Sequence, residues 1–174
     1  MFWFKESYKS RVRKLAESML AFDLMSAPGL SADRPDIGHY AYNGLEGVAA
    51  KIWCIDRALR VLPSESQFLK AQDEVRTTFI NAMRTSYSQS EIRSLVLPVF
   101  EQRHKEYESI FDSGGTPSKS ITDVLGAMID RFVEFEEVDP VHKIAAMPYL
   151  GHAILLEPTK QVKAMSSGES SVRW

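Results

Sequence analysis

Residues 41–62 read AYNGLEGVAAKIWCIDRALRVL, and this stretch decides the fold. Its apolar residues recur at alternating steps of four and three: Ala41, Leu45, Val48, Ile52, Ile55, Leu59 and Leu62. Steps of this size return to one face of an α-helix. Burial of the large side chains in this set contributes on the order of 10 kcal/mol before the entropy of ordering the chain is subtracted. The pattern predicts a helix that stops at Pro63 and lies at the centre of the core.

Helix start signals divide the rest of the chain. A Ser, Thr, Asp or Asn followed three residues later by an acidic or amide residue stabilises a helix N-terminus, because these side chains satisfy unpaired amide groups. Asn43 with Glu46 resembles such a pair, known as a capping box, at the start of the central helix. Asp36 is a second candidate cap for that helix. Further starts are expected at Ser64, Ser88, Ser120 and Asp139, the last followed by Pro140. Pro98 is expected to kink or split the helix that starts at Ser88.

These segments predict an all-α protein, a single-domain bundle of five or six amphipathic helices with short loops. Strand signals are absent, since no segment alternates apolar and polar residues for long. The bundle is expected to span residues 1–157. Residues 158–174 are polar and rich in serine, which predicts a C-terminal tail.

Composition limits the classes of function. The chain has 174 residues, a formal net charge of −2 and one cysteine, Cys54. A lone cysteine excludes an intrachain disulfide and a four-cysteine zinc site, and its place beside the apolar stripe predicts a buried, inert thiol. The net charge does not favour nucleic acid as a partner. We find no apolar run long enough to span a membrane and no secretory signal, so we expect a cytoplasmic protein.

No catalytic constellation stands out, and we expect no cofactor. Glu101 and His104 form a Glu-x-x-His pair, which di-iron bundles use twice but this chain carries once. The charged run that contains this pair is interpreted as a solvated helix face, with Glu101–Lys105 and His104–Glu108 contacts at spacing four.

Three further histidines leave a metal or ligand site open. His142 and His152 lie ten residues apart on one predicted helix, so they occupy neighbouring faces, and His39 is the third. The pattern favours ordinary surface or half-buried histidines. The alternative is a bundle enzyme or carrier with a metal or small-ligand site in its core, built from His142, His152, Glu101 and His104.

The N-terminal segment is the strongest candidate for a binding surface. Three aromatic residues, Phe2, Trp3 and Phe4, precede a basic set that comprises Lys5, Lys9, Arg11, Arg13 and Lys14. Aromatic and basic residues on one helix dock into partner grooves or lie on anionic membranes. The simpler interpretation is a core helix whose polar face is basic.

Two other groups complete the list of candidates. Acidic residues gather around the end of the predicted fifth helix, namely Asp130, Glu134, Glu136, Glu137 and Asp139. Carboxylates at a helix C-terminus oppose its dipole, so we expect a basic neighbour, most simply the N-terminal helix of the same chain. The alternatives are the same helix of a second subunit, a basic partner, or an acidic face that is simply solvated. Tyr40 and Tyr42 form an aromatic group beside His39, and tyrosine suits both binding surfaces and buried anchors.

The favoured hypothesis is a small helical protein that acts by binding another protein, as regulators, immunity proteins and phage anti-defence proteins do. It rests on the segregated charge, the aromatic N-terminus and the lack of a catalytic motif. The residues expected to contact the partner are Phe2, Trp3, Phe4, Lys9, Arg11, Arg13, Lys14, Tyr40 and Tyr42.

Overall fold

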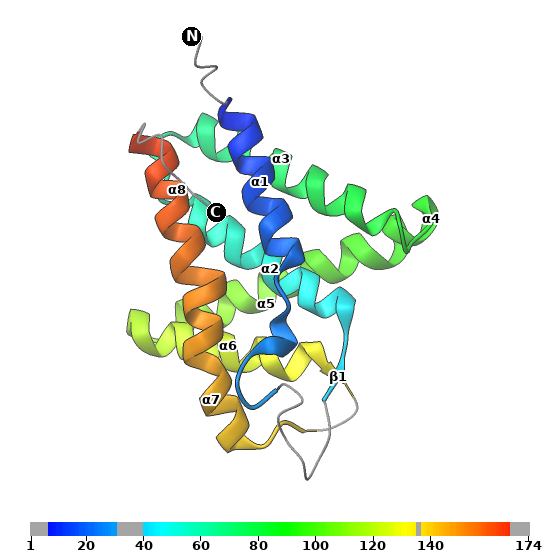
Figure 1. The fold of residues 1–174 in the computed structure, drawn as a ribbon, viewed down its shortest axis with the longest axis vertical. Helices are drawn as coiled ribbons and strands as arrows, with labels where there is room; N and C mark the ends of the chain where they lie inside the picture. Colours follow the sequence, from blue (N-terminus) through cyan, green and yellow to red (C-terminus); the bar gives the residue numbers. More distant parts are fainter. Residues whose placement is uncertain (1–6, 31–39, 135–136, 168–174) are drawn as a thin grey trace.

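The computed structural model describes residues 7–30, 40–134 and 137–167, and within them the chain is an all-α bundle, as predicted. Within these ranges the helical segments follow one another as six rods, whose arrangement can be followed in Figure 1. They are α1 (Tyr8–Ala21), α2 (Gly44–Leu59), α3 (Glu65–Met83), the rod of α4 (Gln89–Glu91), η2 (Ile92–Val96) and α5 (Leu97–Ser113), α6 (Pro117–Phe132), and the rod of α7 (Pro140–Leu150), η3 (Gly151–Leu156) and α8 (Glu157–Ser167). A short 3-10 turn, η1 (Leu24–Ser26), follows α1.

Helix α2 is the centre of the core, as its sequence predicts. Twelve of its sixteen residues are buried, and it packs against α1, α3, α5, α6, α8 and η3. Trp53, Ile55 and Leu59 are almost completely removed from solvent. Helix α2 also buries two charged residues, Lys51 and Asp56.

Most of the predicted caps are confirmed. The side chain of Asn43 accepts the amide of Glu46 at the start of α2, so Asn43 rather than Asp36 is the cap. Ser64 caps α3, and Ser88 forms a full capping box with Glu91. Asp139 caps α7, which begins at Pro140.

The predicted start at Ser120 is wrong. Helix α6 begins at Pro117, and the side chain of Thr116 accepts the amide of Lys119. Thr116 followed by Pro117 combines a cap with a proline at the first helical position, which is a stronger start signal than Ser120 with Asp123. Ser120 is instead buried in the first turn.

One antiparallel bridge interrupts the helical pattern. Strand β1 (Ala41–Tyr42) pairs with β2 (Val133–Glu134), with Ala41 opposite Glu134 and Tyr42 opposite Val133. The bridge is too short to alternate apolar and polar residues, so the sequence carries no strand signal for it. It fixes the entry to α2 beside the end of α6.

Each of the two long rods contains a π-helical segment that ends two residues before a proline. Segment η2 precedes Pro98 and η3 precedes Pro158. Proline has no amide hydrogen and its ring crowds the carbonyl four residues earlier, which lies inside the wider π turn in both rods. The rod therefore continues through Pro98 with a π segment, where the sequence predicted a kink or split.

The last rod extends further than predicted. The sequence indicates a polar tail from residue 158, whereas α8 continues to Ser167 and packs on α1 and α2. Val162 and Met165 are buried there, and η3 lets the helix accept Pro158. Figure 1 shows α7 and α8 as one column along the side of the bundle. None of the helices in the described ranges has the length and apolar character needed to cross a membrane.

Candidate functional site

The described part of the basic N-terminal segment is held against α3. Lys9 Nζ lies 3.2 Å from Glu74 Oε2, and Arg13 Nε donates to Glu74 Oε1 at 2.8 Å. Glu74 is almost completely buried, so its pairing with Lys9 and Arg13 holds α1 against α3. Arg11 is half-buried on the same helix. Phe2, Trp3 and Phe4 lie outside the described residues, and partner docking by this segment stays a prediction.

The expected contact between the basic helix and the acidic group near residue 130 is wrong. Asp130 pairs with Lys143, and Asp139 is used as the cap of α7. The physical reason is local: α7 runs back beside the end of α6 and supplies the cation itself. Glu136 lies outside the described residues.

The two tyrosines have different environments. Tyr40 is 6% exposed; its hydroxyl accepts the amide of Asp139 at 3.1 Å and lies 3.1 Å from His142 Nδ1. Tyr40 is therefore an internal anchor between the start of α2 and α7, which removes it from the expected partner surface. Tyr42 is exposed at its edge and packs against Phe132, and burial of the rest of the ring raises its pKa to about 12.

Among the described residues the candidate metal ligands do not gather at one point: Glu101 and His104 share α5, the other two histidines lie elsewhere, and His39 lies outside the described residues. His142 contacts Tyr40, His152 is exposed on η3, and His104 lies on α5 beside Asp56. Within residues 7–30, 40–134 and 137–167, no group of three His, Cys, Asp or Glu side chains is placed to hold an ion. Cys54 is fully buried in α2, and burial raises the pKa of its thiol, which opposes thiolate chemistry.

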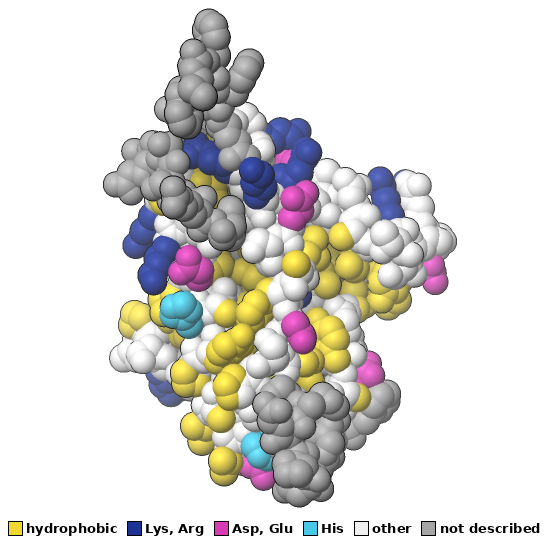
Figure 2. Space-filling model, viewed as in Figure 1, with side chains coloured by type: hydrophobic (Ala, Val, Ile, Leu, Met, Phe, Trp, Pro, Cys, Tyr) yellow, Lys and Arg dark blue, Asp and Glu magenta, His cyan; other side chains and the backbone are white. Residues whose placement is uncertain are grey.

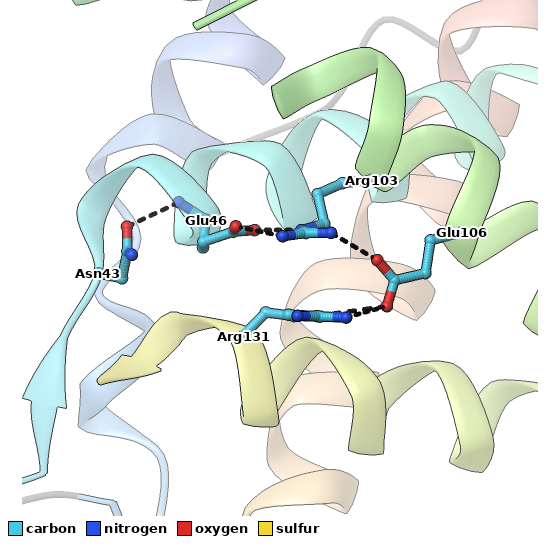
Figure 3. Close-up of polar contacts among 5 residues, drawn as sticks. All are labelled: Asn43, Glu46, Arg103, Glu106 and Arg131. Carbon is cyan, nitrogen blue, oxygen red and sulfur yellow. Dashed lines mark hydrogen bonds and ion pairs between the residues drawn. The ribbon is translucent and has the colours of Figure 1, made fainter. Parts of the chain in front are cut away.

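The charged run of α5 is only partly the solvated face that its sequence predicts, since Glu101 and Lys105 are exposed whereas Arg103 is buried. Figure 3 shows Arg103 between Glu46 of α2 and Glu106. Arg103 is 8% exposed and donates to both oxygens of Glu46 at 2.6 and 2.7 Å and to Glu106 at 2.7 Å. Arg131 of α6 donates to the other oxygen of Glu106 at 2.9 Å. Two carboxylates and two guanidinium groups thus tie three helices together with their charges cancelled.

A second polar link joins α5 to α2. The indole nitrogen of Trp53 donates to Glu108 Oε1 at 2.8 Å, and Arg60 donates to Glu108 Oε2 at 2.9 Å. Arg57 also contacts this carboxylate and covers the ring of Phe111. Each carboxylate in these two links has a cationic partner, so both links stabilise the fold, and the second link carries one guanidinium more than it has carboxylates.

Asp56 is the exception among the buried charges. Its side chain is 2% exposed, yet it has one short hydrogen bond, from Gln72 at 3.1 Å. Arg76 and His104 lie further away, at 3.6 and 3.8 Å, and the second carboxylate oxygen has no hydrogen-bond partner among the described residues. Burial raises the pKa of this carboxyl, and the neighbouring cations do not cancel that effect.

Asp56→Asn is expected to raise the free energy of unfolding at pH 7 by about 1 kcal/mol, because it removes a charge that burial disfavours. Since folding raises this pKa, the native state holds the proton more readily than the unfolded chain, and ionised Asp56 weakens the fold as the pH rises. The gain in unfolding free energy from Asp56→Asn should therefore shrink as the pH falls toward about 4, the pKa of an aspartate in the unfolded chain. Urea unfolding at several pH values measures it; a benefit that does not change with pH would contradict this account of Asp56.

An apolar groove lies between α6 and the column of α7 and η3. It has a volume of about 450 Å³ and is lined by Ser118, Ile121, Thr122, Leu125, Ile144, Met147, Pro148, Gly151, His152, Leu155 and Leu156. Two glycines bring its walls together. A Cβ atom at Gly151 would lie 3.2 Å from Leu125, and one at Gly126 would lie 3.3 Å from Met147.

Large apolar side chains remain exposed along this groove. Val141 is 70% exposed, Ile144 67% and Leu156 53%. Val141 and Ile144 are three residues apart and share one helix face, and Met147, Pro148 and Leu155 of the groove wall lie between Ile144 and Leu156, so we call this set the exposed stripe. Figure 2 shows hydrophobic side chains gathered over the part of the column where α7 lies. Sequence analysis missed this surface, although the apolar content of residues 140–156 on more than one helix face was a usable signal.

Comparison with known proteins gives no guide to the role of these sites. No family model matches the chain, and neither curated proteins nor solved structures include a match. The function must therefore be argued from the residues themselves.

Proposed function

We propose that this protein acts by binding another protein, and that the groove between α6 and α7 receives an apolar helix of that partner. The observation that carries this proposal is the exposure of two large apolar residues that line the groove, Ile144 and Leu156, with exposed Val141 one turn before Ile144. Large apolar side chains in a contiguous patch lose free energy in water, and such patches mark interaction sites.

The dimensions of the groove support a helix as the occupant. From Ile144 to Leu156 the column rises by about 18 Å at roughly 1.5 Å per residue, the length of a helix of about three turns. Grooves between two helices commonly accept an amphipathic helix through apolar residues three or four positions apart. Ile121 and Leu125 of α6 form the facing wall with the same spacing.

The charges beside the groove define the partner's chemistry. Lys143 pairs with Asp130, and Lys119 pairs with Asp123. These acids and bases are equal in number and satisfy one another, so the docking face of the partner is expected to be apolar and uncharged. A helix that lies on an anionic membrane needs an excess of basic residues at its edge, which these pairs do not provide.

The test uses one exposed apolar residue inside the groove and one outside it. Ile144→Glu is expected to weaken binding of the partner at least about tenfold, because it places a charge at the centre of an apolar interface. Leu69→Glu is the matched control, since Leu69 on α3 is 53% exposed and lies outside the groove. Both variants should retain native unfolding curves within about 0.5 kcal/mol, as surface substitutions do.

The measurement has two steps. The partner is first identified as the protein that co-purifies with the native chain and with Leu69→Glu but not with Ile144→Glu. It is then expressed and titrated by calorimetry against all three proteins. Equal binding of the Ile144→Glu and native proteins would rule out the groove, and retention by lipid vesicles instead of a protein would replace it with a membrane role.

A further inference from the structure

A cleft separate from the groove lies between α1 and the column of η3 and α8, which runs beside α1 in Figure 1. It has a volume of about 650 Å³, within the range of roughly 300–1,000 Å³ that is typical of small-molecule sites. Its apolar lining includes buried Leu15, Met19 and Pro158. Two stacked aromatic rings, Phe22 and Tyr149, also line it, with their centroids 6.0 Å apart. These walls suit a ligand with a hydrocarbon or aromatic body.

The charge of the cleft is negative. Its polar lining residues are Ser18, His152, Glu157 and Gln161, and the described part of the lining contains neither Lys nor Arg. Glu157 therefore supplies a single negative charge that no lining residue cancels. Lys160 Nζ lies 3.9 Å from Glu157 Oε2, beyond hydrogen-bond distance, and the Lys160 side chain is 66% exposed. Water screens a pair of this kind, so Glu157 retains most of its attraction for a cation inside the cleft.

Gln161 adds a hydrogen-bond acceptor that lacks a donor. Its side chain is buried, and its Nε2 donates to Glu157 Oε1 at 3.3 Å, so the amide lies beside the carboxylate. Its Oε1 has no hydrogen-bond partner among the described residues. An amide oxygen buried without a donor is costly, and here it belongs to a residue that lines the cleft. Both the charge and the unpaired group of the cleft thus call for a ligand that donates hydrogen bonds.

We propose that this cleft binds a small organic ammonium ion with an apolar body, whose ammonium group is held by Glu157 and Gln161. An alkylammonium group has three N–H donors and no acceptor, so it pairs with the carboxylate and, after a rotation of the Gln161 amide, with its unpaired oxygen. The apolar body contacts Leu15, Met19 and the aromatic pair, whose ring faces also attract a cation.

The same chemistry disfavours other ligand classes. A carboxylic acid would bring a second negative charge beside Glu157, and a neutral alcohol would leave that carboxylate without a counter-ion. The role does not depend on the groove between α6 and α7, although His152 lines both sites.

The test titrates phenethylamine, phenethyl alcohol and hydrocinnamate into the full-length protein and follows backbone amide chemical shifts. The three compounds share a phenylethyl body and differ in charge. At about pH 8 an alkylammonium is charged and free imidazole is neutral. Phenethylamine is expected to bind at least about tenfold more tightly than phenethyl alcohol, and hydrocinnamate is expected to bind most weakly. The shifted amides should lie in α1, η3 and α8 around the cleft.

Variants test the two groups that hold the ammonium. Glu157→Gln should weaken phenethylamine binding about tenfold and leave the affinity for phenethyl alcohol within about twofold. Glu17→Gln is the matched control, since it makes the same change of charge at an exposed residue of α1 outside the cleft. Gln161→Leu removes the amide acceptor and should weaken phenethylamine binding about fivefold. Ser18→Trp places an indole at the exposed side of the cleft and should abolish binding of both compounds.

Several results would overturn the proposal. They are equal or tighter binding of hydrocinnamate or phenethyl alcohol, no saturable shift up to about 10 mM phenethylamine, shifts confined to α6 and α7, or native affinity for phenethylamine in Glu157→Gln. Ile144→Glu in the separate groove should bind phenethylamine as the native protein does, so this result and the test of the groove remain distinct.

Discussion

Arg103→Met is expected to lower the free energy of unfolding by about 3–5 kcal/mol. The substitution keeps most of the side-chain volume but leaves Glu46 without its bidentate partner. Glu106 loses one of its two guanidinium contacts in the same step. An ionised carboxylate that is largely buried and unpaired is far less stable than one in water, which accounts for the size of the effect. Urea unfolding followed by circular dichroism measures it.

Arg131→Met is the matched control for this variant. Arg131 contacts Glu106 from the surface, with a side chain that is 45% exposed, so its loss should cost less than about 1 kcal/mol. Replacing Glu46, Arg103 and Glu106 together by apolar residues should recover much of the stability, because no buried charge is then left alone. A loss below about 1 kcal/mol for Arg103→Met would show that solvent reaches the carboxylates freely.

Trp53→Ala is expected to cost about 3–5 kcal/mol, through the cavity that it leaves beside α5. Trp53 is 1% exposed, packs edge-on against Tyr107 at 5.9 Å between ring centroids, and donates to Glu108. Trp53→Phe is the matched variant, because it keeps a ring and removes the hydrogen bond. Its expected cost is about 1–2 kcal/mol. Chemical denaturation of both variants separates packing from hydrogen bonding, and equal costs would contradict this assignment.

The helical core was predictable because it depends on local pattern. The spacing of Ile52, Ile55 and Leu59 identified α2 as central, and caps such as Asn43 and Ser64 are short-range signals that the structure confirms. The end of the last rod was not predictable in this way. Helix α8 is polar in composition, and its two buried anchors, Val162 and Met165, gain their stability only from α1 and α2.

The candidate sites depended on which helices become neighbours. The sequence identified Glu101 and His104, but they line a hollow that also needs Arg76 and Ile80 from α3. The one local signal was Asp56, a carboxylate within an apolar run, which sequence analysis passed over. Arg103 was interpreted as solvated because its bidentate partner, Glu46, lies on another helix, where local spacing gives no signal for it.

The exposed stripe illustrates the same limit. Apolar residues at helical spacing predict a buried face, and for Leu150 and Ile154 that holds. Ile144 and Val141 show the same kind of side chain on the same rod, yet they stay exposed in the part of the chain that the structure describes. Periodicity identifies a face that avoids water, but it does not say whether that face is covered within the chain or by another molecule.

The central claim is that the stripe beside α6 contacts a partner protein. The most direct measurement introduces photoreactive benzoylphenylalanine at position 144 or, as a control, at position 69, in cells that naturally make this protein. We predict one specific crosslinked protein from position 144, with the crosslink in an apolar helical segment of that protein, and none from position 69. Crosslinks of equal yield from both positions, or crosslinks from position 144 to lipid alone, would contradict the claim.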